Sequence, residues 1–391
     1  MKKIVCLLSI LVVSISLFMP STSIARDVWT AEEANAWYAK QPFRAGVNYI
    51  PAYAINPIEI WQKETFNLDV FEKEFALMES IGFNAIRLFL NDLVVNDDPK
   101  GFLERFEQVL KAADKHGIGV MVVFFTNGGR TDGKLGKQPE PDGTHNSGWR
   151  RQPAYSILRD KSKWGHLEFY VKTVVRAYAK DPRIICWDIF NEPGNIKSDH
   201  IVGGGKGLTE ADMEHLRRCS LDLVRESAKW TLSLDPIQPI TYCLWSRTPK
   251  GFEKVQIENS DILSFHSYGG LGQQVQRYKK LKKYNRPVLC TEWLGRSTGS
   301  TLNPILEFHK DNNIWSFAFG FVAGKMETWR NWPAMDDSEI RSIWFHDLYR
   351  ADYTPYCPEE IAYIKRILKG ENACKTPSKK KNKSRKVGKY F

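Results

Sequence analysis

The sequence has few of the patterns that hold metals, disulfides or phosphates. It contains 7 cysteines and 8 histidines in 391 residues, but no C-x-x-C pair and no histidine pair with zinc-ligand spacing. No glycine-rich phosphate fingerprint follows the first apolar run, where residues 48–51 read Asn-Tyr-Ile-Pro. We therefore expect no metal and no cofactor. If a disulfide forms, we expect it between Cys357 and Cys374.

Long hydrophobic runs are also scarce, with one exception at the start of the chain. Lys2 and Lys3 precede an apolar stretch over residues 4–19, which is shorter than the ~20 residues that a membrane-spanning helix needs. The small-x-small pattern of residues 23–25, Ser-Ile-Ala, follows this stretch, as it does in secretory signal peptides. We therefore predict a signal peptide over residues 1–25, cleaved between Ala25 and Arg26, a secreted or periplasmic protein, and no membrane span.

Acidic residues are absent from the last part of the chain, residues 375–391, which we predict to be a disordered basic tail. Together with Lys2 and Lys3, this tail carries nearly all of the net charge of +11, so the chain between is almost neutral. A nucleic-acid partner is therefore disfavoured. We expect the tail to contact polyanions or the cell surface, and we expect a monomer.

Short apolar runs alternate with helix-period segments along the rest of the chain. Most of the runs are continuously apolar, as strands buried on both faces are. Stripes such as Phe71, Phe75 and Met78 have helical spacing and lie between the runs. The predicted strands are residues 43–50, 84–90, 119–125, 183–190, 239–245, 261–268, 287–294 and 314–322. This order predicts an α/β fold, a single (β/α)8 TIM barrel over residues 26–374.

The connection after the third predicted strand, residues 126–163, is far longer than an ordinary loop and rich in Gly, Asp and Pro. Such length usually indicates a functional loop. His145 and Trp149 on this loop are candidate substrate contacts, although packing within the loop would explain them equally well.

Two glutamates end apolar strands where a charge is costly to bury without a partner. Glu192 closes the fourth strand in the sequence Asn191-Glu192-Pro193, and Glu292 closes the seventh strand before Trp293. The carboxyl ends of barrel strands carry the active sites of this fold. A structural salt bridge is the alternative for either residue alone, but a pair at this end indicates acid–base chemistry.

The motif W-x-x-x-N-E-P of the fourth strand, paired with T-E-W in the seventh, resembles the clan A glycoside hydrolases, and family 5 most of all. The resemblance implies a retaining enzyme that cleaves a β-linked polysaccharide or oligosaccharide, of the glucan or mannan type, by double displacement. It assigns Glu192 as acid/base, Glu292 as nucleophile and Asn191 as the partner of the sugar 2-hydroxyl. It also matches Arg87, His266 and Tyr268 to family positions around the nucleophile.

The sequence departs from the family at the eighth strand, where many members end with a tryptophan under the sugar. This strand carries phenylalanines there, with Trp315 at its opposite end, so Trp329 or Trp332 is a candidate replacement. Further candidates for stacking on sugars are aromatic residues at or near strand ends, namely Tyr49, Trp245 and Trp293.

Two other functions stay open at this point. Residues 295–299 read Gly-Arg-Ser-Thr-Gly, which matches the G-x-S-x-G motif of serine esterases and makes Ser297 a candidate nucleophile. A barrel that binds carbohydrate without cleaving it would keep the aromatic residues but lose a carboxylate. Both carboxylates are present, which favours the hydrolase.

Overall fold

The computed structural model describes residues 25–202, 205, 207–332, 335 and 342–371. The basic tail, Cys374 and nearly all of the predicted signal peptide lie outside the described residues, so these expectations stay predictions. Within the described part, no helix is long and apolar enough to cross a membrane.

Parallel strands close into a barrel in the order β1-β10-β9-β8-β7-β6-β3-β2. Every barrel strand overlaps one of the apolar runs, so the predicted (β/α)8 barrel is confirmed. The strands are β1 (Ala45–Tyr49), β2 (Ala85–Phe89), β3 (Gly119–Thr126), β6 (Ile184–Asn191), β7 (Ile240–Leu244), β8 (Leu263–His266), β9 (Val288–Trp293) and β10 (Trp315–Phe319).

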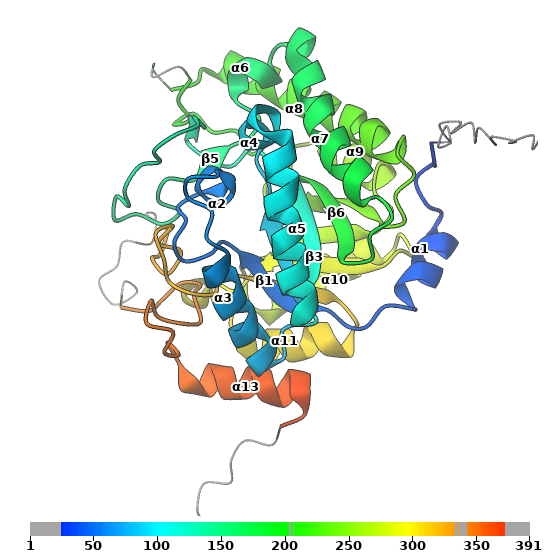
Figure 1. Ribbon diagram of the computed structural model, residues 1–391. Coiled ribbons are helices and arrows are strands. Elements are labelled where there is room, and N and C mark those ends of the chain that lie inside the picture. Colours follow the sequence, from blue (N-terminus) through cyan, green and yellow to red (C-terminus); the bar gives the residue numbers. More distant parts are fainter. Residues whose placement is uncertain (1–24, 203–204, 206, 333–334, 336–341, 372–391) are drawn as a thin grey trace, which may run out of the picture.

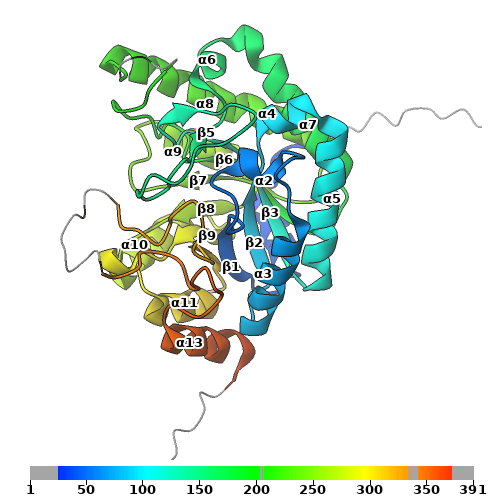
Figure 2. The same cartoon turned by 60° about the vertical axis from the view of Figure 1, so that its left-hand side comes forward.

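Helices between the strands surround the barrel (Figures 1 and 2). The stripe Phe71, Phe75 and Met78 is buried on α3 as its spacing predicts. Thr209 caps α8 through a capping box with Asp212, which fixes where that helix begins. The main helices are α3 (Leu68–Ile81), α5 (Pro99–Lys115), α7 (Trp164–Tyr178), α8 (Glu210–Leu232), α9 (Phe252–Glu258), α10 (Leu271–Lys282), α11 (Leu302–Asp311) and α13 (Pro358–Lys369).

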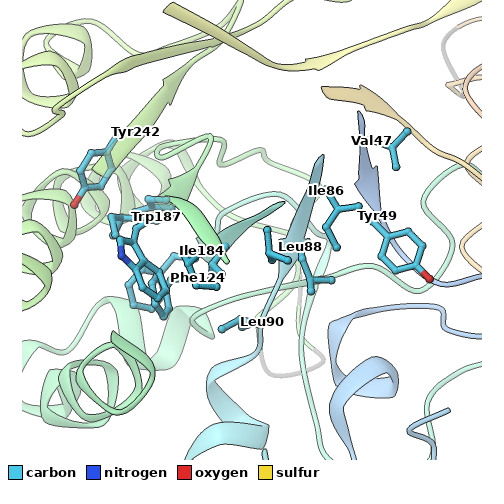
Figure 3. Packing of buried hydrophobic residues seen from close by; sticks show 14 of the residues in the cluster. Val47, Tyr49, Ile86, Leu88, Leu90, Phe124, Ile184, Trp187 and Tyr242 are labelled. Atoms are coloured by element: carbon cyan, nitrogen blue, oxygen red, sulfur yellow. The ribbon is translucent and has the colours of Figure 1, made fainter. Parts of the chain in front are cut away.

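The main hydrophobic core fills the layer between strands and helices. Figure 3 shows part of it, with Leu88 on β2, Phe124 on β3 and Trp187 on β6. The stacked rings of Phe124 and Trp187 have centroids 5.7 Å apart. This packing covers the outer faces of the strands and leaves their carboxyl ends free to carry polar side chains.

The amino-terminal end of the barrel is closed by α1 (Ala31–Tyr38). Tyr38 packs on Trp315 with ring centroids 5.1 Å apart, so Trp315 lies at the end away from the candidate site, as expected. Arg26, the first residue after the predicted cleavage point, forms a 2.6 Å ion pair with buried Asp261. The chain is therefore anchored to the barrel from its first few described residues.

The long connection after β3 contains structure of its own. A small parallel sheet pairs β4 (Thr131–Asp132) with β5 (Arg150–Arg151), followed by α6 (Tyr155–Leu158) and the 3-10 turn η1 (Lys161–Lys163). Gln152 pairs with Thr126 at the end of β3, which holds this loop against the barrel mouth. Other described connections between strands and helices contain short elements. These are α2 (Pro57–Trp61), α4 (Asp92–Asp97) and the 3-10 turn η2 (Arg296–Thr298).

Candidate active site

Strand register brings polar side chains together at the carboxyl-terminal mouth of the barrel. Asn48 on β1 lies beside Arg87 on β2, and His266 on β8 lies beside Glu292 on β9. All four residues are buried to 6% exposure or less. Because parallel strands end at the same edge, these side chains share one small volume inside an otherwise apolar barrel.

Glu192 joins this group because the backbone turns sharply after β6. Successive strand residues point to opposite faces, so Asn191 and Glu192 would diverge in a regular strand. Glu192 instead has φ 46°, in the left-handed region that residues other than glycine rarely adopt. Its N–H contacts Cys243 Sγ at 3.0 Å, and Gly194, at φ 80°, continues the turn. Such strain in a cleft is characteristic of functional positions.

The two glutamates face each other across a short gap. One carboxylate oxygen from Glu192, one from Glu292 and one ring nitrogen of His266 all lie within 4.8 Å of one another. This upper limit lies close to the roughly 5–5.5 Å between the carboxyl groups of retaining glycosidases and well below the roughly 6.5–9.5 Å of inverting ones. The three groups also have the spacing of metal ligands, but the guanidinium bonded to Glu292 would repel a divalent cation.

Arg87 connects the strands beneath this pair. It donates to Glu292 at 2.9 Å, to Asp188 at 2.8 Å, and to the amide oxygens of Asn191 and Asn48 at 2.7 Å each. Its side chain is fully buried. A guanidinium has a fixed planar fork of donors, so it sets the positions of all four partners at once.

The surroundings of the two carboxyl groups differ in charge. Burial raises the pKa of Glu192 above its ordinary value, and the direct donor opposing that rise is the neutral amide of Asn195, at 2.6 Å. Burial also raises the pKa of Glu292, but Arg87 and the Tyr268 hydroxyl, each 2.9 Å away, oppose it. A permanent charge favours ionisation more than an amide does, so Glu292 is the better placed of the two to be ionised.

His266 lies between the carboxyl groups without adding charge at neutral pH. Its Nδ1 is 2.9 Å from Glu192 and 3.3 Å from Glu292. Burial lowers the pKa of His266 to about 4, so the ring is neutral at pH 7. A neutral imidazole can donate to a carboxylate or accept from a protonated carboxyl group. The pair is therefore bridged by a polar group that fits either protonation state.

Aromatic rings form one wall beside Tyr268. Trp332, in the loop after β10, packs on Tyr268 with centroids 5.3 Å apart and on Phe345 at 4.8 Å. His145 from the long loop reaches the same group, 5.6 Å from Phe345 and 5.0 Å from His346. Of the two candidate replacements for the missing strand-end tryptophan, Trp332 is therefore the one next to the carboxylates, whereas Trp329 packs on Trp344.

Two of the residues predicted to contact sugar point away from the barrel mouth. Tyr49 is fully buried against Phe71 and Phe75 of α3, and its hydroxyl donates to Glu74; Figure 3 shows it within the core layer. Trp293 is 1% exposed and packs on His309 of α11. Each follows an inward-pointing residue, so strand alternation turns it outward to the helices. The expectation that Tyr49 and Trp293 stack on sugars is wrong.

The remaining predicted aromatic residues occupy two other places. Trp149 is partly exposed and packs edge-on against Phe89, over whose ring the Arg87 guanidinium lies. Trp245, just past β7, is 9% exposed and lines a cavity beside α9 and α10. Trp149 is therefore linked to Arg87 through Phe89, with no direct contact to either glutamate among the described residues, whereas Trp245 faces a neighbouring hollow.

Four residues of the site were missed by the sequence reasoning. Asn48 and Asp188 bond to Arg87, Asn195 bonds to Glu192, and Cys243 contacts the backbone of Glu192. Asn48 and Asp188 carry the same signal as the glutamates, a polar side chain inside an apolar strand. Asn195 and Cys243 had no such signal.

The serine motif does not form an esterase site. Ser297 lies on η2, and its hydroxyl donates to the side-chain oxygen of Asn331. Among the residues that the structure describes, no histidine contacts Ser297. A serine hydroxyl without an adjacent base is a poor nucleophile.

Paired carboxyl groups at the mouth of a (β/α)8 barrel, with an arginine and a tyrosine on one of them, define a glycoside hydrolase. The chain belongs to glycosyl hydrolase family 5: the family described as "Cellulase (glycosyl hydrolase family 5)" matches residues 54–338. No curated protein matches the sequence.

Solved structures of similar fold include a mannosidase, a mannanase and a protein bound to a mannose-containing disaccharide. A GH5_18 variant from Streptomyces cattleya in complex with Manβ1-4GlcNAc is 15% identical, with a TM-score of 0.55 over 86% of this chain and 82% of that chain. The exo-β-1,4-mannosidase from Opitutaceae bacterium strain TAV5 is 16% identical, with a TM-score of 0.55 over 90% and 62%. A β-mannanase from the blue mussel Mytilus edulis is 14% identical, with a TM-score of 0.51 over 83% and 91%. At this identity the likeness establishes the shared fold.

Proposed function

We propose that the protein is a retaining β-glycoside hydrolase in which Glu292 is the nucleophile and Glu192 the acid/base. The observation that carries this proposal is the gap of at most 4.8 Å between oxygens of the two carboxyl groups. That gap leaves no room for a water between a general base and the sugar, which an inverting mechanism requires.

In the first step, Glu192 gives its proton to the glycosidic oxygen while Glu292 attacks the anomeric carbon. Burial, which raises the pKa of Glu192, keeps that proton in place until the substrate arrives. Arg87 and Tyr268 hold the attacking oxygens of Glu292 from two sides. The C–O bond to the leaving sugar breaks, and a glycosyl ester on Glu292 forms.

In the second step, Glu192 is a carboxylate and takes a proton from water, which attacks the same anomeric carbon. The ester bond to Glu292 breaks, and the sugar leaves with its original β configuration. His266, neutral and within 3.3 Å of both carboxyl groups, accommodates the change in charge between them. Asn191, which Arg87 holds at 2.7 Å, is placed to bond the sugar 2-hydroxyl.

The substrate we propose is a β-linked glucan or mannan, or an oligosaccharide derived from one. The family match and the mannoside-processing enzymes of similar fold support this choice. Trp332 would supply the flat apolar face under the sugar that the eighth strand lacks, because it packs directly on Tyr268. We further propose that the enzyme is exported, through the signal peptide predicted from residues 1–25.

The test is a panel of β-linked polysaccharides and aryl β-glycosides, with the anomeric configuration of the first product followed by proton NMR. We expect turnover on at least one β-glucoside or β-mannoside and a β product that later mutarotates. An α product formed first would contradict the retaining mechanism, and inactivity on every β-glycoside would contradict the proposed substrate class.

A further inference from the structure

Two long connections meet above the barrel mouth. The connection after β3 reaches the connection after β10, although β2 and β1 lie between these two strands in the barrel (Figure 1). The Ser147 N–H donates to the Met326 carbonyl oxygen at 3.1 Å. His145 donates from Nδ1 to the Arg330 carbonyl oxygen at 2.7 Å. We call the two facing segments, residues 142–149 and 324–332, the loop bridge.

A third connection, the one after β1, is bonded to both halves of the loop bridge. Lys325 donates from its N–H to the Ala52 carbonyl oxygen at 3.1 Å and forms a 2.7 Å ion pair with Glu59. Asn56, which caps α2, donates to the Gly148 carbonyl oxygen at 3.0 Å. The loop bridge therefore spans the mouth over β1 and β2 as one bonded wall.

The loop bridge stands beside Glu292. The Tyr268 hydroxyl donates to Glu292 at 2.9 Å, and the Trp332 ring packs on Tyr268 with centroids 5.3 Å apart. The His145 ring lies 6.3 Å from the Trp332 ring. Among the described residues, no member of the loop bridge forms a hydrogen bond or ion pair with Glu192. Ring contacts therefore connect the bridge to the nucleophile and not to the acid/base.

The strands that lie between the two glutamates around the barrel have short connections. β7 reaches α9 through residues 245–251, and β8 reaches α10 through residues 267–270. After β10, by contrast, the chain passes through residues 320–357 before α13 begins. The mouth therefore has long, mutually bonded connections over β10, β1 and β2, and short ones over β7 and β8.

The proposed chemistry places the kept sugar on the side of the loop bridge. Glu292 attacks the anomeric carbon of the sugar that stays on the enzyme, and Glu192 protonates the oxygen of the sugar that leaves. In a β-linked glycan, further sugars on the non-reducing side are attached to the kept sugar, so they would continue away from Glu192. A second sugar in that direction would meet the loop bridge.

Two ring nitrogens on this side have no protein partner in the described part of the chain. His346, whose ring lies 5.4 Å from Tyr268, donates from Nδ1 to the Leu294 carbonyl oxygen, and His145 donates from Nδ1 to Arg330. Burial lowers the pKa of both rings, that of His145 to about 4, so each is neutral and its Nε2 is an acceptor. A free hydroxyl can donate to such a nitrogen, whereas the oxygen of a further glycosidic bond has no proton to donate.

We infer that the protein is an exo-glycosidase: one terminal sugar is held between Glu292 and the loop bridge, and His145 and His346 accept hydrogen bonds from its hydroxyl groups. The inference rests on the proposed function for the roles of the two glutamates. Each cycle consumes one water and releases one monosaccharide from the non-reducing end. The leaving group, on the side of the short connections, is free to be a long chain.

The product test uses β-linked glucan and mannan pentasaccharides that carry a fluorescent label at the reducing end. Chromatography of the early time course should show unlabelled monosaccharide and labelled tetrasaccharide first, followed by labelled trisaccharide. Labelled mono- or disaccharide among the first products would show internal cleavage. That result would overturn the inference and leave the hydrolase standing.

The variant test removes one ring of the wall. In His145→Ala, the ratio of disaccharide to monosaccharide released from an aryl β-disaccharide should rise at least about tenfold, because a second sugar gains room. His145→Phe keeps a ring without the acceptor, so it should stay exo-acting and lose up to about tenfold in kcat/KM on an aryl β-monosaccharide. His215→Ala, at an exposed histidine of α8, is the matched control and should change neither value. Melting temperatures establish that each variant is folded, and an unchanged ratio in folded His145→Ala would contradict the bridge as the barrier.

A binding measurement separates this inference from the proposed function, because it requires no turnover. Calorimetry with Glu292→Gln compares a β-linked trisaccharide with the same trisaccharide methylated at the non-reducing hydroxyl that would carry the next sugar. The methylated sugar should bind at least about tenfold more weakly, since it meets the bridge and cannot donate to the histidines. Equal affinity for the two would refute the one-sugar site, whether or not any glycoside is cleaved.

Discussion

Removing the amide of Asn195 should move the alkaline limb of the activity profile. Asn195 donates to Glu192 at 2.6 Å, and this bond favours the ionised carboxylate. In Asn195→Ala the ionised form loses that partner, so the pKa of Glu192 rises and the protonated acid persists to higher pH. The alkaline limb of kcat/KM should therefore shift upward.

The size of the shift follows from the contact. A hydrogen bond to a charged group contributes about 1.5–3 kcal/mol, and one pKa unit corresponds to about 1.36 kcal/mol. The Glu192 side chain is 16% exposed, so water replaces part of the lost bond. We expect a shift of about one unit in the alanine variant. Asn195→Asp should shift the limb further, because it places a second carboxylate beside the first.

The assay is the pH dependence of kcat/KM on an oligosaccharide whose leaving group needs protonation. Ser220→Ala is the control for movement of the loop, because Ser220 accepts from Gly194 at 3.1 Å without touching Glu192. That control should leave the alkaline limb in place. A downward shift in Asn195→Ala, or the same shift in Ser220→Ala, would refute the reasoning.

Three other changes have defined outcomes. Tyr268→Phe removes a hydroxyl that donates to Glu292 at 2.9 Å. The pKa of Glu292 should therefore rise, and the acid limb of kcat/KM should move to higher pH. An unchanged acid limb would contradict the role of Tyr268 in holding Glu292 ionised. Ser297→Ala should cost at most about tenfold in kcat, since the hydroxyl donates to the amide oxygen of Asn331 and, among the described residues, contacts no base. A loss of several orders of magnitude in this variant would point back to an esterase. Deleting residues 376–391 should leave activity on a neutral substrate and the melting temperature unchanged; a large fall in melting temperature would show that the tail is structural.

Much of the fold could be predicted because the barrel strands are buried on both faces. A strand such as β3 is apolar at nearly every position, and that pattern distinguishes it from the amphipathic α5 that precedes it. Glu192 and Glu292 were visible for the same reason, as charges in apolar surroundings. Asn48 and Asp188 gave an equal signal, so the sequence could have indicated them as well.

Other features depend on geometry that the local sequence does not determine. Asn195 reaches Glu192 only because the backbone takes a left-handed turn at Glu192 itself. The contact of Trp332 with Tyr268 joins loops from two different strands. The error over Trp293 was avoidable, since a residue directly after an inward-facing glutamate points outward in a regular strand.

The central claim is that Glu292 forms a covalent bond with the sugar. A 2-deoxy-2-fluoro β-glucoside or β-mannoside with a good leaving group should trap that ester, because fluorine slows both steps and the good leaving group speeds only the first. Peptide mass spectrometry of the inactivated enzyme should find the fluorosugar on Glu292, and Glu292→Gln should remain unlabelled. A label on any other residue, or phosphonate labelling of Ser297 with activity surviving in Glu292→Gln, would contradict the account.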